Sequence, residues 1–135
     1  MERITSFTID HDVLVPGFYI SRKDGDITTY DLRTRRPNKG DYMSNADMHS
    51  VEHMFATYIR NSEIADSVIY FGPMGCQTGF YLLVRDVEPK KVFQITKEVL
   101  SQIIAHEGEV FGASAAECGH YENLDLEIAK EAVSY

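Results

Sequence analysis

The stretch Val13–Arg35, VLVPGFYISRKDGDITTYDLRTR, carries the clearest structural pattern in the chain. Its two halves, Val13–Arg22 and Ile27–Arg35, are rich in the β-branched and aromatic residues that favour strands. Between them lie Asp24 and Gly25, a dipeptide typical of tight hairpin turns. The stretch therefore predicts an antiparallel β-hairpin near the start of the domain.

The remaining pattern predicts further strands and three helices. Apolar residues spaced for one helix face follow a pair of possible N-cap residues, and a proline suits the first turn of a second helix. Strands in hairpins with separate helices indicate an α+β fold, in which helices pack on an antiparallel sheet of four or five strands. The expected elements are a helix over Ala46–Asn61 capped by Ser44 or Asn45, strands over Ser67–Phe71 and Thr78–Asp86, a helix from Glu88 to about His106, a short strand over Phe111–Ala116 and a terminal helix over Leu124–Ala132.

Length and charge limit the function classes. The chain has 135 residues, which predicts a single domain over 1–135. Its formal net charge of −8 argues against nucleic acid as a partner, because phosphate binding needs a basic surface. No secretory signal and no apolar run long enough for a membrane span are visible, which favours a cytoplasmic protein with its two cysteines reduced.

The segment His49-Ser50-Val51-Glu52-His53 is the strongest chemical signal. Histidines at i and i+4 project from neighbouring turns of one helix face, close enough to share a metal ion. Glu52 lies beside them, where a carboxylate can move protons or orient a ligand. Taken alone, the motif also fits a helix with two solvent-exposed histidines.

A catalytic metal site commonly has three protein ligands, so a third ligand is needed. Cys118, next to Gly119, is the preferred candidate, with His120 as a rival and a buried structural cysteine as the alternative for Cys118. Cys76 lies in a glycine-flanked loop between two expected strands, which suits a catalytic thiol better than a core residue.

Three other readings of these residues remain open. A metal-dependent hydrolase of the H-x-x-E-H type would use Glu52 to activate water, but would need a carboxylate ligand and a larger chain. A metal or thiol sensor would pair Cys76 with Cys118. A structural zinc site would want four protein ligands.

The motifs, in this order and over nearly the whole chain, resemble the S-ribosylhomocysteine lyase (LuxS) family. One position departs from the family pattern, since Tyr70 stands where an aspartate is usual. The matching segments are Ser6-Phe7, Asp10-His11, Asp31-Leu32-Arg33, Pro37-Asn38, His49–His53, Pro73–Gly79, Cys118-Gly119 and Asp125-Leu126-Glu127.

The resemblance implies an α/β sandwich that works as a homodimer with two sites at the interface. It implies one divalent metal per subunit, Fe²⁺ in the cell and replaceable by Zn²⁺ or Co²⁺. The roles it implies are metal ligands His49, His53 and Cys118, catalytic acid–base residues Cys76 and Glu52, and substrate-binding residues Ser6, His11 and Arg33, with Ser6 and His11 coming from the partner subunit.

The implied activity is that of a carbon–sulfur lyase acting on S-ribosylhomocysteine. The sugar carbonyl moves from C1 to C2 and then to C3 through two enediolates, whose charge a divalent metal stabilises as a Lewis acid. Cys76 and Glu52 supply the weak bases for the proton transfers. Removal of the C4 proton then expels homocysteine and leaves 4,5-dihydroxy-2,3-pentanedione, the precursor of autoinducer-2. For Arg33, stabilising the Cys76 thiolate and binding a substrate oxygen are both open.

Overall fold

A computed structural model describes residues 14–133 of the chain. In it, the predicted hairpin forms from β1 (Gly17–Asp24) and β2 (Ile27–Arg33), joined by a tight turn at Gly25. Gly25 has a φ of +61°, a conformation that glycine adopts without steric cost. The hairpin predicted from the dipeptide is therefore confirmed.

The hairpin extends into a four-stranded antiparallel sheet. β3 (Val68–Pro73) and β4 (Gly79–Arg85) form a second hairpin, and the strand order is β1-β2-β4-β3. β2 pairs with β4 from Ile27 opposite Arg85 to Arg33 opposite Gly79. This register places the β3–β4 turn, which carries Cys76, beside the end of β2.

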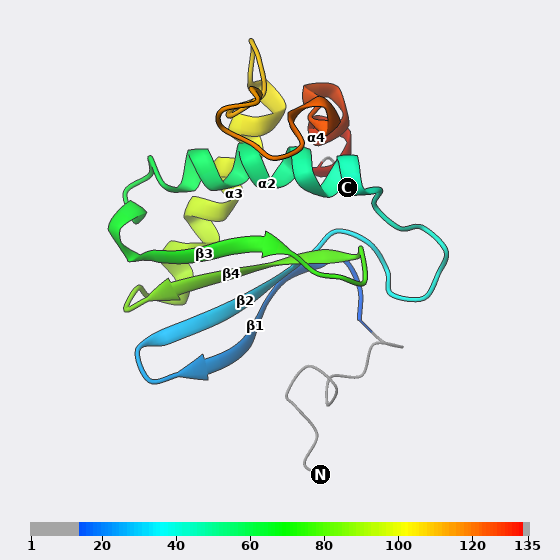
Figure 1. Ribbon diagram of the computed structural model, residues 1–135. Helices are drawn as coiled ribbons and strands as arrows, with labels where there is room; N and C mark the ends of the chain where they lie inside the picture. The colour runs from blue at the N-terminus through cyan, green and yellow to red at the C-terminus, as the bar shows by residue number, and fades with distance from the viewer. Residues whose placement is uncertain (1–13, 134–135) are drawn as a thin grey trace.

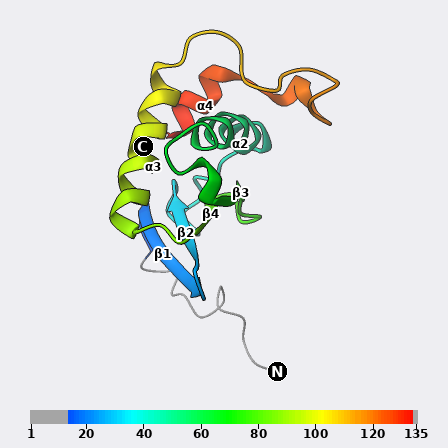
Figure 2. The ribbon, with the colours of Figure 1, turned by 90° about the vertical axis from the view of Figure 1, so that its left-hand side faces the viewer.

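Within residues 14–133, three helices and two 3-10 turns complete the α+β fold, and the helices lie on one side of the sheet (Figures 1 and 2). None of the helices in residues 14–133 is both long and apolar enough to cross a bilayer. The helical elements are α2 (Asn45–Ile59), η1 (Ala65–Ser67), α3 (Pro89–Ala105), η2 (Tyr121–Asn123) and α4 (Leu126–Val133).

Helix α2 begins where the sequence places its cap. Ser44 Oγ accepts from the Asp47 N–H at 3.0 Å, and Asp47 Oδ2 accepts from the Ser44 N–H at 2.7 Å. This reciprocal pair satisfies two backbone donors at the helix start and holds the register of the helix. His49 and His53 are thereby directed away from the sheet, because the opposite face of α2 is buried.

The core lies between α2, α3 and the sheet. Phe55 from α2 stacks on Phe71 with ring centroids 4.1 Å apart, and Phe71 stacks on Phe80 at 5.1 Å. These rings come from one helix and two strands, so they fix the height of α2 above the sheet. The fully buried members of this core include Val51, Met54, Ile59, Leu82, Val92 and Ile103.

One predicted element is wrong. Phe111–Ala116 was expected to form a short strand, but the segment consists of turns. It lies across α2 rather than beside an edge of the sheet (Figure 1), and Gly112 has a φ of +71°, outside the extended region. Among the described residues, no strand lies beside it to pair with, and its one aromatic side chain, Phe111, packs on Tyr58 of α2 instead.

Tyr30 offers a stability test of the core. Its ring is fully buried between Phe18 and Phe93, yet its hydroxyl has no hydrogen-bond partner within residues 14–133. Tyr30→Phe should raise the free energy of unfolding by about 1–2 kcal/mol in urea titrations, because a buried unsatisfied hydroxyl is removed. Tyr19→Phe is the matched control, since the Tyr19 hydroxyl donates to the Val15 carbonyl and its loss should destabilise the fold.

The same hydroxyl predicts a pH dependence. Burial raises the pKa of the Tyr30 phenol above its usual value of 10.0. When a group has a higher pKa in the folded protein than in the unfolded chain, the fold keeps its full stability below the unfolded pKa. That stability is lost as the pH rises through the folded pKa. The advantage of Tyr30→Phe should therefore grow above about pH 10, and an advantage that shrinks there would contradict this account.

Candidate active site

Three predicted ligand side chains come together beside α2. His49 and His53 occupy successive turns of the helix, and Cys118 reaches them from the segment between α3 and η2. Their potential ligand atoms all lie within 4.8 Å of one another, and His49 Nε2 is 3.2 Å from Cys118 Sγ. His120 is outside this group, but its backbone N–H points at Cys118 Sγ at 3.4 Å.

Both imidazole rings are oriented by a hydrogen bond on the nitrogen facing away from the group. His53 Nδ1 is 2.8 Å from the Phe111 carbonyl, and His49 Nδ1 is 2.7 Å from Asn123 Oδ1. Carbonyl oxygens only accept, so each Nδ1 carries the proton and each Nε2 has a lone pair, which in His49 faces Cys118 Sγ. Metal-binding histidines commonly have this arrangement.

Sequence reasoning missed both of these partners. A backbone carbonyl such as that of Phe111 leaves no mark in the sequence, and Asn123 reads as an ordinary residue of a polar loop. Gly112 is another such position, because a Cβ there would lie 2.9 Å from His53 Nδ1. The bare backbone at Gly112 lets the segment pass close to the imidazole.

A second group of polar residues surrounds Cys76. The exposed thiol lies in the β3–β4 turn, 3.1 Å from Thr78 Oγ1 and 3.9 Å from Arg33 Nη1. Arg33 Nη1 donates to Thr78 Oγ1 at 2.7 Å, so the Thr78 proton is free to point at the sulfur. Both contacts suit a thiolate better than a thiol.

The guanidinium of Arg33 is held by a buried ion pair. Its Nη2 lies 2.6 Å from Asp31 Oδ2, and both side chains are at least 96% buried. Asp31 and Arg33 are two residues apart on β2, so they share one face of the sheet. That spacing is visible in the sequence and, together with the family segment Asp31-Leu32-Arg33, is a signal by which Asp31 could have been found.

Tyr81 borders the same group from β4. Burial raises the pKa of its phenol, and the negative charge of Asp31 raises it further, while Arg33 acts in the opposite direction. Tyr81 is paired with Asp31 across the β2–β4 ladder. The phenol therefore stays protonated as a hydrogen-bond donor beside the ion pair.

The other predicted site residues are placed as follows. Glu52 is half-buried on α2, directly before His53, and makes no hydrogen bond or ion pair within residues 14–133. Its carboxylate is thus available to a ligand. Ser6 and His11 lie outside the described residues.

Tyr70, the departure from the family pattern, packs on Gly72. Its ring lies over Gly72 on edge strand β3, where a Cβ at Gly72 would meet the Tyr70 hydroxyl oxygen at 1.9 Å. Tyr70 remains 49% exposed. A tyrosine at 70 in this position therefore requires glycine at 72, two residues ahead of the Met74–Cys76 turn.

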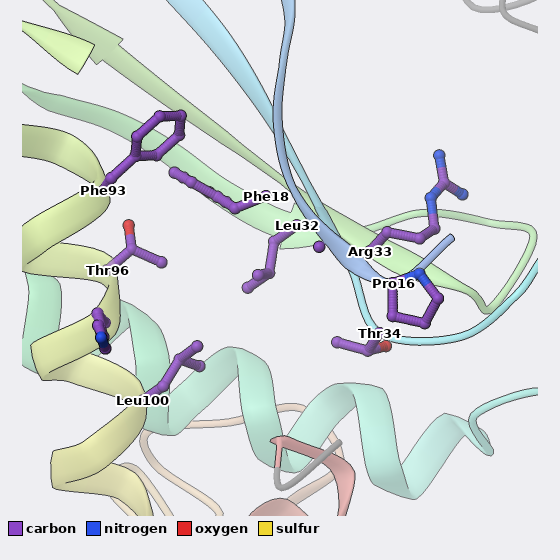
Figure 3. Close-up of a pocket in the computed structure, with 10 residues that line it drawn as sticks. Pro16, Phe18, Leu32, Arg33, Thr34, Phe93, Thr96 and Leu100 are labelled. Carbon is purple, nitrogen blue, oxygen red and sulfur yellow. The ribbon is translucent and has the colours of Figure 1, made fainter. Parts of the chain in front are cut away.

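Among the hollows bordered by the described residues, one adjoins the Cys76 thiol and another borders the backbone of Arg33. A hollow of about 260 Å³ is bordered by Cys76, Thr78 and Asn38. A cavity of about 460 Å³ lies between β1 and α3, walled by Phe18, Phe93 and Leu100, and the Arg33 guanidinium extends away from it (Figure 3). Its mainly apolar wall does not suit a sugar with several hydroxyl groups.

An α+β domain with a His/His/Cys group and a separate, hydrogen-bonded thiol has the parts of a small metal-dependent enzyme. The profile of the family S-Ribosylhomocysteinase (LuxS) matches residues 4–135, and the chain belongs to this family. It is 46% identical over 136 residues to the S-ribosylhomocysteine lyase of Clostridium beijerinckii, covering 96% of this chain and 86% of the relative. It is 47% identical over 135 residues to that of Finegoldia magna, with the same coverage.

Proposed function

We infer that this chain is an S-ribosylhomocysteine lyase, a carbon–sulfur lyase that releases homocysteine and the autoinducer-2 precursor. The observation that carries the inference is the convergence of His49, His53 and Cys118 in a chain of the LuxS family. The relatives that bear the name of this activity align over almost all of the chain.

His49, His53 and Cys118 would hold one divalent metal ion per subunit, Fe²⁺ in the cell and Zn²⁺ or Co²⁺ as replacements. The donor set fits, because two imidazoles whose Nδ1 atoms are bonded elsewhere come together with one sulfur and leave a fourth position open. When bound, the ion supplies Lewis-acid stabilisation of negative charge on substrate oxygens.

Cys76 and Glu52 carry the proton transfers. Each carbonyl shift removes a proton from one sugar carbon and returns a proton to its neighbour, so the successive shifts need weak bases placed on the right faces of the sugar. In the last step a proton leaves C4, the C5–S bond breaks, and sulfur departs as the thiolate of homocysteine. The free Glu52 carboxylate and the Thr78-bonded Cys76 sulfur suit these roles.

Arg33 is proposed to act mainly through Cys76. The guanidinium is 3% exposed and divided between Asp31 and Thr78, with its Nη1 3.9 Å from the sulfur. This arrangement favours stabilisation of the thiolate over a direct bond to a substrate oxygen. Ser6 and His11, outside the described residues, are proposed to bind the substrate.

The chain is further proposed to work as a homodimer with two sites at the interface. The helices lie on one side of the sheet (Figure 2), and the other side carries Tyr70, Tyr81 and Leu83, which share a face through the β3–β4 register. Ile69 and Tyr70 are 38% and 49% exposed on the edge strand. Exposed apolar residues of this kind commonly mark interfaces.

Leu83→Arg tests the dimer. The charge should convert the protein to a monomer in light scattering and remove turnover, because each site would lose the partner's Ser6 and His11. A monomeric wild-type protein with full turnover would overturn this part of the proposal.

Gly112→Ala tests the packing behind His53. The substitution should cost about 1–2 kcal/mol of unfolding free energy, because alanine resists a positive φ. The new Cβ should also push the His53 ring and weaken Co²⁺ binding, measured by titration of the apoprotein. Gly108→Ala is the matched control, since its φ is also positive but its Cβ would meet nothing within 4 Å.

The activity is tested directly by an anaerobic thiol-release assay. The protein loaded with Fe²⁺ or Co²⁺ is mixed with S-ribosylhomocysteine, and free thiol is followed with time. Metal-dependent thiol release is expected. A metal-loaded dimer that releases no thiol would overturn the assignment and favour a sensor or hydrolase.

A further inference from the structure

The segment after α3 crosses α2 (Figure 1), and an aromatic cluster joins the two elements next to the His49/His53/Cys118 group, called the metal group below. The cluster consists of Tyr58 from α2, His106 from the end of α3 and Phe111 from the crossing segment. Tyr58 Oη lies 2.6 Å from His106 Nδ1. None of these side chains belongs to the group of metal-ligating residues.

The hydrogen bonds of the cluster have a defined direction. His106 Nε2 is 3.0 Å from the Glu109 carbonyl, which can only accept, so Nε2 carries the proton of the neutral ring. His106 Nδ1 is then an acceptor, and the Tyr58 hydroxyl donates to it. The pair thereby joins α2 to the end of α3 and to the start of the crossing segment.

Phe111 connects this pair to the metal group. Its ring packs edge-to-face against Tyr58, with centroids 5.3 Å apart, and against His106 at 4.8 Å. Its backbone carbonyl accepts the hydrogen bond from His53 Nδ1 at 2.8 Å. Because the segment from 106 to 120 contains no helix or strand, no backbone ladder fixes this carbonyl, and the ring contacts take that task.

We propose that Tyr58 and His106 are positioning residues for the metal site, acting through Phe111 on the orientation of His53. The inference rests on the proposed function, since the orientation of His53 matters only if His53 is a ligand. The hydroxyl–imidazole bond fixes the two rings that hold Phe111, the Phe111 carbonyl fixes Nδ1–H, and Nε2 is left directed at the ligand group.

A positioning role predicts that loss of the Tyr58 hydroxyl lowers the affinity for the metal more than it lowers the stability of the fold. Tyr58→Phe removes only the hydroxyl and keeps the ring that packs on Phe111, so the urea midpoint of unfolding should fall no further than in Tyr19→Phe, which also loses one tyrosine hydrogen bond. The affinity for the metal should nevertheless fall by about tenfold, the size of effect typical for outer-shell partners of metal-binding histidines. A residue with a merely structural role would instead lower the urea midpoint of unfolding strongly and leave the affinity for the metal nearly unchanged.

The test is an anaerobic titration of the apoprotein with Co²⁺, followed by the ligand-field and thiolate charge-transfer bands. We expect weaker binding and shifted bands for Tyr58→Phe and for His106→Ala, and no further loss when the two are combined, because they remove the same link. Tyr19→Phe, which loses a tyrosine hydrogen bond on β1, should bind like the wild type.

The outcomes distinguish a failure of the positioning role of Tyr58 and His106 from a failure of the proposed metal site. Wild-type affinity and an unchanged spectrum in Tyr58→Phe would overturn the positioning role alone. Losses that simply add in the double variant would also contradict it, because they would point to two independent effects. A wild-type protein that binds no Co²⁺ would overturn the proposed metal site, and this inference with it.

Discussion

Cys76→Ala is expected to lower the rate of thiol release from S-ribosylhomocysteine by about 10³-fold or more, in the range found when a general acid–base group is removed. The metal content should not change, because Cys76 is outside the His49/His53/Cys118 group. The fold should not change either, because the thiol is exposed in a turn. The rate is followed by thiol release, and metal content is measured on the same samples.

Two further variants show which part of the Cys76 environment matters. Thr78→Val removes the hydroxyl that faces the sulfur and should lower the rate by a smaller factor, about tenfold to a hundredfold, while Cys76 remains in place. Cys118→Ala should instead remove the metal together with turnover. If Cys76→Ala lost its metal but kept its activity on metal-saturated protein, the roles of the two cysteines would have to be exchanged.

The fold could be predicted from the sequence where local signals and burial agree. The Asp24–Gly25 turn, the Ser44 cap and the apolar face of α2 each have a short-range physical cause, and each is present in the structure. The segment from 111 to 116 had no such agreement. Phe111 is its only residue that favours strands, and whether a strand forms also depends on a partner. The tertiary structure places α2 beside the segment instead of a strand.

The candidate site likewise has features with a local signal in the sequence and features that depend on tertiary packing. The i, i+4 histidines could be placed on one helix face from their spacing alone. The approach of Cys118, 69 residues from His49, depends on how α3 and the crossing segment pack, which spacing does not determine. The partners of the two histidines, a backbone carbonyl and the amide of Asn123, required the structure because neither has a distinctive sequence pattern.

The two halves of the site are held by different kinds of structure. The thiol and its polar neighbours lie at the ends of β2 and β4, where the sheet ladder fixes the backbone. The metal group combines a rigid helix with a segment that has no regular structure between residues 106 and 120. We therefore expect substitutions near Cys76 to affect proton transfer and those near Phe111 to affect metal affinity.

Arg33→Met should cause the largest loss of stability among the variants considered, about 3–5 kcal/mol of unfolding free energy. Methionine has a similar length but no charge, so the buried carboxylate of Asp31 would lose the guanidinium that lies 2.6 Å from its Oδ2. Thr78 would lose its donor as well, and turnover should fall with the loss of the positive charge 3.9 Å from Cys76 Sγ. Urea unfolding and thiol release measure the two effects on the same protein.

The double variant Asp31→Leu/Arg33→Met separates the stability effect from the catalytic one. Replacing both members of a buried ion pair by apolar residues commonly restores much of the stability that either single change removes. The fold should therefore recover while turnover stays low, because the charge beside Cys76 is still absent. Recovery of both would show that Arg33 serves the fold alone. Recovery of neither would mean that the pair is needed for the local structure of β2, and the proposed effect of Arg33 on the Cys76 sulfur would then be left without support.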